Sequence, residues 1–129
     1  MSPWRIIAIG LLCALSGHAV AQDVAAGEKS FAVCRACHQI GPNAKNAVGP
    51  VLNGVVGRTA GTYPGYAYST ANKNSGLTWN EETLQQYLAN PQAMVKGTKM
   101  VFPGLKDPAK VKDVIAFLKT YKADGSRNQ

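Results

Sequence analysis

Cysteine is scarce in this chain, which limits how its fold can be stabilised. The 129 residues include three cysteines and two histidines. Cys34 and Cys37 lie within one turn of each other, and Cys13 lies near the N-terminus. No framework of disulfides can therefore support the fold.

Long apolar runs are absent as well. The run from Ile6 to Leu15 has about ten residues, which is too short to span a bilayer. Arg5 precedes it and Ala19-Val20-Ala21 follows, a pattern typical of a secretory signal with an A-x-A cleavage site. We predict that residues 1–21 are a cleaved signal peptide and that the mature protein is periplasmic. Residues 22–129 are then one small domain.

Acidic residues are few, with 7 Asp and Glu against 14 Lys and Arg. Loss of Arg5 with the signal would change the formal net charge from +7 to about +6. An excess of this size favours acidic partners. A nucleic-acid partner is not expected, because the chain has no recognised nucleic-acid motif and no dense basic run.

No segment alternates convincingly between apolar and polar residues with the period of a strand. Apolar positions and capping residues instead predict helices over residues 23–33, 78–90 and 108–121. Residues 41–76 are rich in Gly, Pro, Asn and Tyr and predict a long irregular segment. The sequence therefore predicts an all-α fold with long irregular loops and little or no sheet.

The run Cys34-Arg35-Ala36-Cys37-His38 is the most informative feature of the chain. The pattern C-x-x-C-H is the attachment site of c-type haem. Two thiols three positions apart can each add to one vinyl group of the same porphyrin, and the next histidine can bind the iron. C-x-x-C also occurs in redox-active dithiols and as half of a zinc site. A redox-active dithiol usually lies in a βαβ unit, and a zinc site needs a second pair of Cys or His ligands. Residues 22–129 show neither pattern.

An iron bound by His38 needs a second axial ligand, and the mature chain has no other histidine. The candidates are Met94, Met100, a lysine, or no side chain. Met94 follows Pro91 in a predicted short helical turn, where a methionine usually packs. Met100 lies in a loop with Gly and Pro between two predicted helices, and we predict that it is the ligand.

Further motifs, in this order and spacing, resemble class I cytochromes c, and most of all the short periplasmic "c-two" cytochromes of purple bacteria. The matching segments are Gly27-x-x-x-Phe31, Cys34-x-x-Cys37-His38, Gly49-Pro50-x-Leu52-x-Gly54, Gly57-Arg58, Tyr68-Ser69-Thr70-Ala71-Asn72-Lys73-Asn74, Thr78-Trp79, Tyr87-Leu88 and Gly97-Thr98-Lys99-Met100-x-Phe102-x-Gly104. The resemblance covers essentially the whole mature chain. It implies the cytochrome c fold, with helices wrapped round one covalently attached haem c. It also implies that Gly27 and Phe31 pack against Val114 and Phe117, where the first and last helices cross.

The resemblance implies a role for each of several residues around the haem. The Pro50 carbonyl would accept a hydrogen bond from His38 and fix its ring. Tyr68 and Trp79 would donate hydrogen bonds to the haem propionates, and Arg58 would offset their charge.

A second group of implied roles lies around the predicted methionine ligand. Tyr87 would donate a hydrogen bond to the Met100 sulfur. Asn72 and Thr98 would hold a buried water near it. Phe102 would cover the haem edge.

The lysines that could surround the exposed haem edge are Lys45, Lys96, Lys99, Lys106 and Lys110. Two positions depart from the lysine-rich mitochondrial relatives. Val33 and Asp107 stand where those proteins often have lysine. We therefore expect a less basic docking face and a weaker dependence of partner association on salt.

These features predict a soluble, monomeric one-electron carrier and not an enzyme. Its expected partners are a membrane donor such as a bc-type complex and a membrane acceptor such as a photosynthetic reaction centre or a terminal oxidase. The alternative is a small haem enzyme or gas sensor with a labile sixth ligand.

Overall fold

A computed structural model describes residues 23–128, so the predicted signal peptide lies outside the described part of the chain. The helices of this part are α1 (Val24–Ser30), the 3-10 helix η1 (Phe31–Ala36), α2 (Thr70–Lys73), α3 (Glu81–Ala89), α4 (Pro91–Met94) and α5 (Pro108–Lys119). In residues 23–128, β-pairing is limited to two isolated bridges, Thr59 with Thr78 and Tyr121 with Arg127. The prediction of an all-α fold is therefore confirmed.

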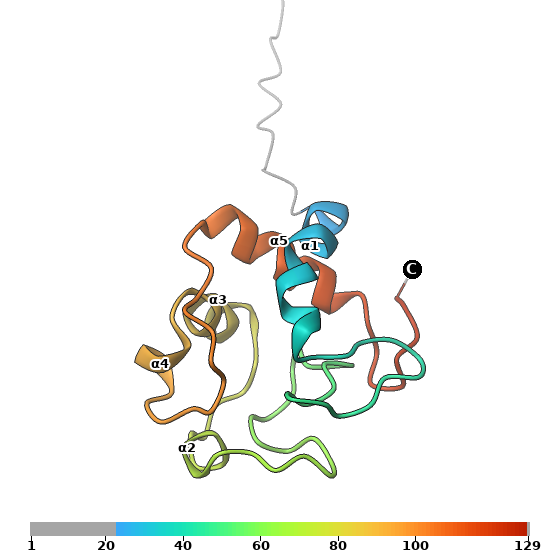
Figure 1. The fold of residues 1–129 in the computed structure, drawn as a ribbon. Coiled ribbons are helices and arrows are strands. Elements are labelled where there is room, and N and C mark those ends of the chain that lie inside the picture. The colour runs from blue at the N-terminus through green and yellow to red at the C-terminus, as the bar shows by residue number, and fades with distance from the viewer. Residues whose placement is uncertain (1–22, 129) are drawn as a thin grey trace, which may run out of the picture.

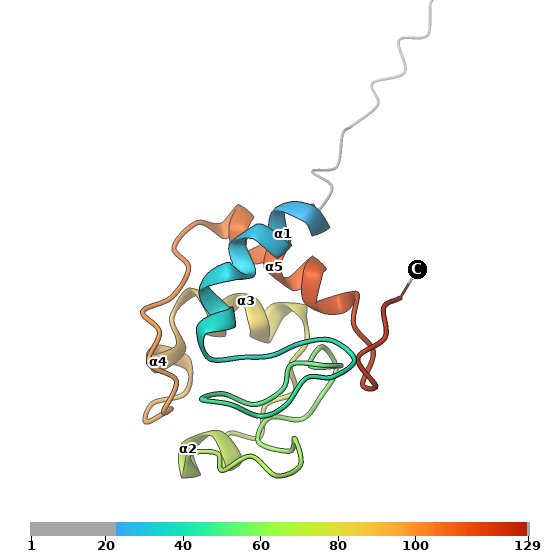
Figure 2. The same ribbon diagram turned by 45° about the vertical axis from the view of Figure 1, so that its right-hand side comes forward.

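The first and last long helices, α1 and α5, cross at one end of the molecule, and α2 lies at the opposite end (Figures 1 and 2). The Asp23 side chain caps α1 by accepting a hydrogen bond from the Ala26 backbone N–H at 3.0 Å. The predicted helix over residues 23–33 ends as an α-helix at Ser30 and continues as η1. A 3-10 turn gives the last carbonyls of an α-helix new hydrogen-bond partners. The α-helix therefore ends earlier than the predicted end at residue 33.

The crossing of α1 and α5 depends on a glycine. A Cβ atom at Gly27 would lie 1.9 Å from the backbone oxygen of Asp113 in α5 and 3.0 Å from Cβ of Phe117. Beside this contact, the rings of Phe31 and Phe117 have centroids 5.1 Å apart. Both rings are fully buried, together with Val114. The predicted packing of the first helix on the last is confirmed.

The helix boundaries in the second half of the chain follow the capping residues. Asn80 caps α3 in a reciprocal pair of hydrogen bonds with Thr83. Asn90 ends α3 and caps α4, which begins with Pro91. The Asp107 side chain caps α5. All three predicted boundaries are therefore close to those of the structure.

The segment between η1 and α3 is irregular, as predicted, except for the single turn of α2. The Ser69 hydroxyl caps that turn by accepting from the Asn72 N–H at 3.1 Å. Elsewhere side chains replace regular pairing, and buried Asn53 exchanges two hydrogen bonds of 2.8 Å with the backbone of Gly41. This segment thereby keeps a defined path around one side of the molecule. None of the helices within residues 23–128 has the length and apolar character needed to cross a membrane.

Candidate haem-attachment site

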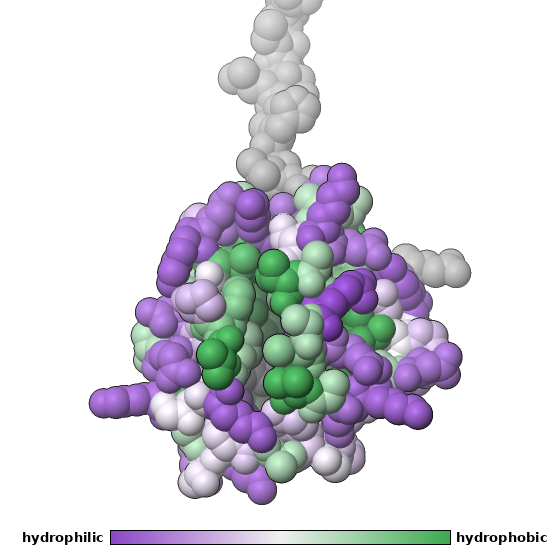
Figure 3. Space-filling model, in the orientation of Figure 1, coloured by the Kyte–Doolittle hydropathy of each residue, from purple (hydrophilic) through white to green (hydrophobic). Residues whose placement is uncertain are grey.

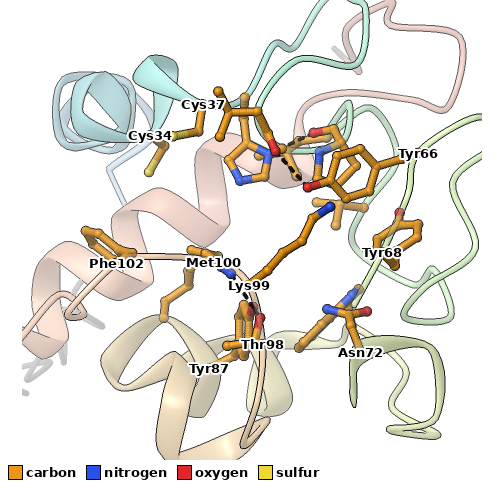
Figure 4. A pocket seen from close by; sticks show the side chains of 18 of the residues that line it. Cys34, Cys37, Tyr66, Tyr68, Asn72, Tyr87, Thr98, Lys99, Met100 and Phe102 are labelled. Atoms are coloured by element: carbon orange, nitrogen blue, oxygen red, sulfur yellow. Dashed lines mark hydrogen bonds between the residues drawn. The ribbon is translucent and has the colours of Figure 1, made fainter. Parts of the chain in front are cut away.

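A deep, mainly apolar cavity of about 330 Å³ opens on the face shown in Figure 3. The picture shows a hollow bordered by apolar residues and surrounded by hydrophilic ones. One side of the cavity carries the C-x-x-C-H turn, and Leu84 and Leu88 of α3 line it with Val114 and Leu118 of α5. Met100 and Phe102 belong to a loop that lines the cavity opposite this turn (Figure 4). Its size is within the usual range of ligand pockets, about 300–1,000 Å³.

The two cysteines of the turn, Cys34 and Cys37, are free, half-buried and part of the cavity lining. Burial raises the pKa of the Cys34 thiol to about 11, Cys37 acts in the same direction, and Arg35 opposes them. A redox-active dithiol needs a stabilised thiolate, so this environment argues against that class of site. Within residues 23–128 no three His, Cys, Asp or Glu side chains are grouped as a metal site, so a zinc site lacks ligands.

The His38 imidazole is held by the next loop. Its Nδ1 lies 2.7 Å from the Pro50 carbonyl oxygen. A carbonyl can only accept, so Nδ1 carries the proton and Nε2 keeps its lone pair. Burial lowers the pKa of His38, which the Pro50 hydrogen bond partly offsets, and the neutral ring is favoured. The structure therefore contains the contact that the resemblance implies for Pro50, and the imidazole has the form that a metal ligand needs.

Gly49, beside Pro50, makes this arrangement possible. A Cβ atom at this position would lie 2.4 Å from Cε1 of His38 and 2.7 Å from Nδ1. Only a residue without a side chain allows the loop to approach the imidazole so closely. The sequence contains the Gly-Pro pair, but its contact with His38 depends on the fold.

The two methionines of residues 23–128 have different environments. Met94 packs against the hydrophobic core and is not part of the cavity lining, whereas Met100 lines the cavity. The Met100 backbone N–H donates to the Thr98 hydroxyl at 3.3 Å, and Gln92 donates to the Thr98 carbonyl at 3.0 Å. Gln92 is therefore a further support of this loop, which the sequence did not reveal.

The hydroxyl of Tyr87 lies 3.1 Å from that of Thr98 in the buried part of the site. The resemblance implies a bond from Tyr87 to the Met100 sulfur instead. In the structure Tyr87 supports Met100 through Thr98, which itself accepts from the Met100 backbone. Burial raises the pKa of Tyr87, so the phenol is neutral and can donate.

The remaining predicted residues all line the same cavity: Arg58, Tyr68, Asn72, Trp79 and Phe102. The Tyr68 hydroxyl oxygen accepts from the Tyr63 N–H at 3.0 Å, so its own proton is free for another acceptor. Arg58 donates to the carbonyls of Asn53 and Val51 at 3.3 and 3.2 Å, and its guanidinium lies over the ring of Tyr63.

The buried Oδ1 atom of Asn72 has no hydrogen-bond partner in the described part of the chain. A buried acceptor of this kind costs free energy unless a water or ligand satisfies it. The apolar lining, the neutral imidazole, the two thiols and this open acceptor together fit a covalently attached haem. A c-type haem protein is the class that the fold and the site define.

Comparison with known proteins gives the same class. The Cytochrome c family model matches residues 24–122. The chain is 53% identical over 122 residues to a cytochrome c2 of Blastochloris viridis, an alignment that covers 95% of this chain and 96% of that protein. It is 57% identical over 107 residues to a cytochrome c2 of Rhodoblastus acidophilus, covering 83% and 100% of the two.

A solved structure supports the assignment at the level of the fold. Cytochrome cH from Methylobacterium extorquens superposes with a TM-score of 0.72 at 60% identity, covering 76% of this chain and 98% of that one. The chain belongs to the cytochrome c family. Membership implies one covalently attached haem c, so the predicted fold and cofactor are confirmed.

Proposed function

We propose that the protein is a periplasmic one-electron carrier, with haem c joined to Cys34 and Cys37 and its iron bound by His38 and Met100. The observation that carries this proposal is the presence of a neutral imidazole and a single thioether in the lining of one apolar cavity. Haem c supplies one iron atom that alternates between Fe(III) and Fe(II).

The residues of this chain bias that couple toward the reduced state. His38 and Met100 would hold the iron, where a neutral thioether would favour Fe(II) and an apolar lining would disfavour the additional positive charge of Fe(III). The Pro50 carbonyl holds His38, and Thr98 with Tyr87 holds the backbone of Met100. Ligands held in place by hydrogen bonds need little rearrangement when one electron is gained or lost.

The mouth of the cavity is the proposed docking face. Val33, Val48 and Val101 line it and are 58%, 71% and 98% exposed. Of the five lysines expected near this face, two already have backbone partners: Lys99 donates to the Ala67 carbonyl, and Lys106 to those of Ala89 and Pro103. These bonds orient the two ammonium groups without removing their charge, while Val33 and Asp107 stand where the lysine-rich relatives often have lysine. An apolar contact with this smaller basic surround favours weak, brief association with a partner surface.

The partners are proposed by kind. A bc-type complex is the proposed donor, and a reaction centre or a terminal oxidase is the proposed acceptor, because the predicted signal would carry the chain to the compartment where these complexes expose their docking sites. The proposed carrier acts as a monomer and not as an enzyme. Electron-transfer kinetics with isolated membrane complexes test this assignment.

Carbon monoxide distinguishes the carrier from a haem enzyme or gas sensor. With Met100 bound, the reduced protein has no free iron position and does not bind carbon monoxide at neutral pH. Rapid and complete binding, seen as a shift of the visible bands, would favour the enzyme or sensor instead.

A further inference from the structure

The guanidinium of Arg58, in the cavity lining, is held by three contacts. Its Nη1 and Nη2 atoms donate to the backbone carbonyls of Asn53 and Val51 at 3.3 and 3.2 Å. Both distances are at the long end for an N–H···O bond, so the two carbonyls alone hold the group loosely. The third contact is the ring of Tyr63, whose centroid lies 5.0 Å from Cζ, within the range of a cation–π contact.

Tyr63 also contacts a second residue of the lining, through its backbone. Its N–H donates to the Tyr68 hydroxyl oxygen at 3.0 Å, which leaves the hydroxyl proton for another acceptor. Tyr68 lies beside Tyr66, and an edge-to-face contact with a centroid distance of 4.8 Å fixes the two rings (Figure 4). Tyr63 itself is not part of the lining. It therefore supports Arg58 and Tyr68 from outside the cavity.

We propose that Tyr63 is a positioning residue, which holds the Arg58 guanidinium at the cavity and thereby raises the reduction potential of the bound haem. It acts through Arg58 and not through a contact of its own with the cofactor. The proposal rests on the proposed function, because it gives Tyr63 a part in setting the potential of the same electron-transfer site.

The charge of Arg58 connects this contact to the potential. Burial lowers the pKa of Arg58, but a guanidinium stays protonated inside proteins, so the positive charge remains. A positive charge at the cavity disfavours the additional charge of Fe(III), and its effect is larger where water is excluded.

The Tyr63 ring replaces water over one face of this guanidinium and uses none of its N–H donors. Two of the five donors meet the backbone carbonyls, which leaves others for the carboxylates of haem c. Without the ring, the guanidinium can turn toward solvent, where its field is screened. Loss of the Tyr63 side chain should therefore lower the potential.

The test measures the reduction potential of the holoprotein in Tyr63→Leu, Tyr63→Phe and a matched control, Tyr121→Leu. The Tyr121 ring lies 4.7 Å from Cζ of Arg127, so the control removes a contact of the same kind outside the cavity lining. We expect the preference for Fe(II) to fall about two- to fourfold in Tyr63→Leu, which is about 18–36 mV at about 59 mV per tenfold. Tyr63→Phe keeps the ring and the backbone N–H, so it should change this preference by less than about 1.5-fold, as should Tyr121→Leu.

A second measurement shows whether Tyr63 acts through Arg58. Tyr63→Leu is repeated in an Arg58→Gln protein. Effects that pass through one group are not additive, so the preference for Fe(II) should then stay within about 1.5-fold of that of Arg58→Gln alone. If Arg58→Gln does not retain haem, exchange of the Arg58 Nε–H with solvent in the reduced protein replaces this step. That exchange should be faster in Tyr63→Leu than in Tyr121→Leu.

The outcomes separate this role from a purely structural one and from the ligand assignment. A wild-type potential in Tyr63→Leu, or an equal fall in Tyr121→Leu, would overturn the proposal. A further fall of full size in the Arg58→Gln background, or equal Nε–H exchange in the two leucine variants, would overturn it as well. The ligand assignment fails on different evidence: a wild-type visible spectrum in Met100→Ala would remove Met100 as the ligand and leave the Tyr63 comparison intact.

Discussion

Single residues at this site act mainly through contacts with the backbone. His38 is oriented by the Pro50 carbonyl at 2.7 Å, and the Met100 N–H is bound by the Thr98 hydroxyl at 3.3 Å. The first contact joins a proposed iron ligand to the next loop, and the second lies within the Met100 loop, where Tyr87 and Gln92 in turn contact Thr98. The ligand geometry therefore depends on residues that never reach the iron.

Gly49→Ala should disturb His38 selectively. The added methyl group would lie 2.4 Å from Cε1 of the imidazole, so the ring or the loop must move and the Pro50 hydrogen bond is weakened. Overpacking of this kind costs about 1–3 kcal/mol of stability. Urea unfolding and the visible spectrum of the holoprotein would measure it. Val48→Ala, at the exposed neighbouring position, is the control; a stable Gly49→Ala protein with an unchanged spectrum would contradict the proposed contact.

At the scale of secondary structure, short helices and their caps set the positions of the loops that line the cavity. The caps at Asp23, Asn80 and Asp107 place α1, α3 and α5. The α1–α5 crossing then holds η1, and with it Cys34, against the core. This crossing depends on the close approach at Gly27.

Gly27→Ala should destabilise the fold although alanine is the better helix former. The gain in helix propensity is about 1 kcal/mol. The new Cβ would lie 1.9 Å from the Asp113 backbone oxygen, which no side-chain movement can relieve. We expect a net loss of about 1–3 kcal/mol in urea unfolding of the holoprotein. Ala25→Gly, at an exposed position of α1, should lose only about 1 kcal/mol; a Gly27→Ala variant more stable than wild type would be incompatible with the close crossing.

The helices and their caps could be predicted from the sequence because these signals are local. The turn of α2 was missed because Thr70–Lys73 is too short to show a period, and η1 was missed because its tightening depends on the packing of Phe31. The named site residues that line the cavity were predicted through a resemblance that covers essentially the whole mature chain, whereas Tyr66, Ser69 and Leu84 in the same lining were not. Their partners could not be predicted from local patterns, because the contact of Thr98 with Tyr87 joins the Met100 loop to α3, and that of Lys99 with Ala67 joins it to another loop.

At the scale of the whole molecule, residues 23–128 are built around an apolar cavity. Side chains of η1, α3 and α5 face that cavity, so the cofactor completes the core. Within residues 23–128 no disulfide offers an alternative support, because Cys34 and Cys37 are both free.

The chain without haem should therefore be largely unfolded. A small domain has little stability to lose, and an unfilled apolar cavity forfeits the packing that the cofactor would supply. A Cys34→Ala, Cys37→Ala double variant produced without haem attachment can be examined by amide NMR. Poor dispersion and a non-cooperative thermal transition are expected; a well-dispersed, cooperative fold would disprove the account of the core.

Partner association should depend only weakly on salt. Exposed valines line the cavity mouth, and Val33 and Asp107 stand where the lysine-rich relatives often have lysine, so fewer positive charges are expected there to steer a partner. The rate of electron transfer to an isolated membrane acceptor, measured from low to high ionic strength, should fall less steeply than for a lysine-rich mitochondrial cytochrome c. The opposite result, an equally steep fall, would mean that the face is more basic than proposed.

The most direct test of the central claim is the reduction potential and visible spectrum of Met100→Ala beside Met94→Ala. Met100 lines the cavity, whereas Met94 is partly buried against the core outside the cavity lining. Met100→Ala should lower the potential, with about 59 mV for each 1.4 kcal/mol of lost preference for Fe(II), and should open the iron to external ligands. Met94→Ala should keep the wild-type spectrum and potential. Wild-type values in Met100→Ala would contradict the claim that His38 and Met100 together close the iron of an electron carrier.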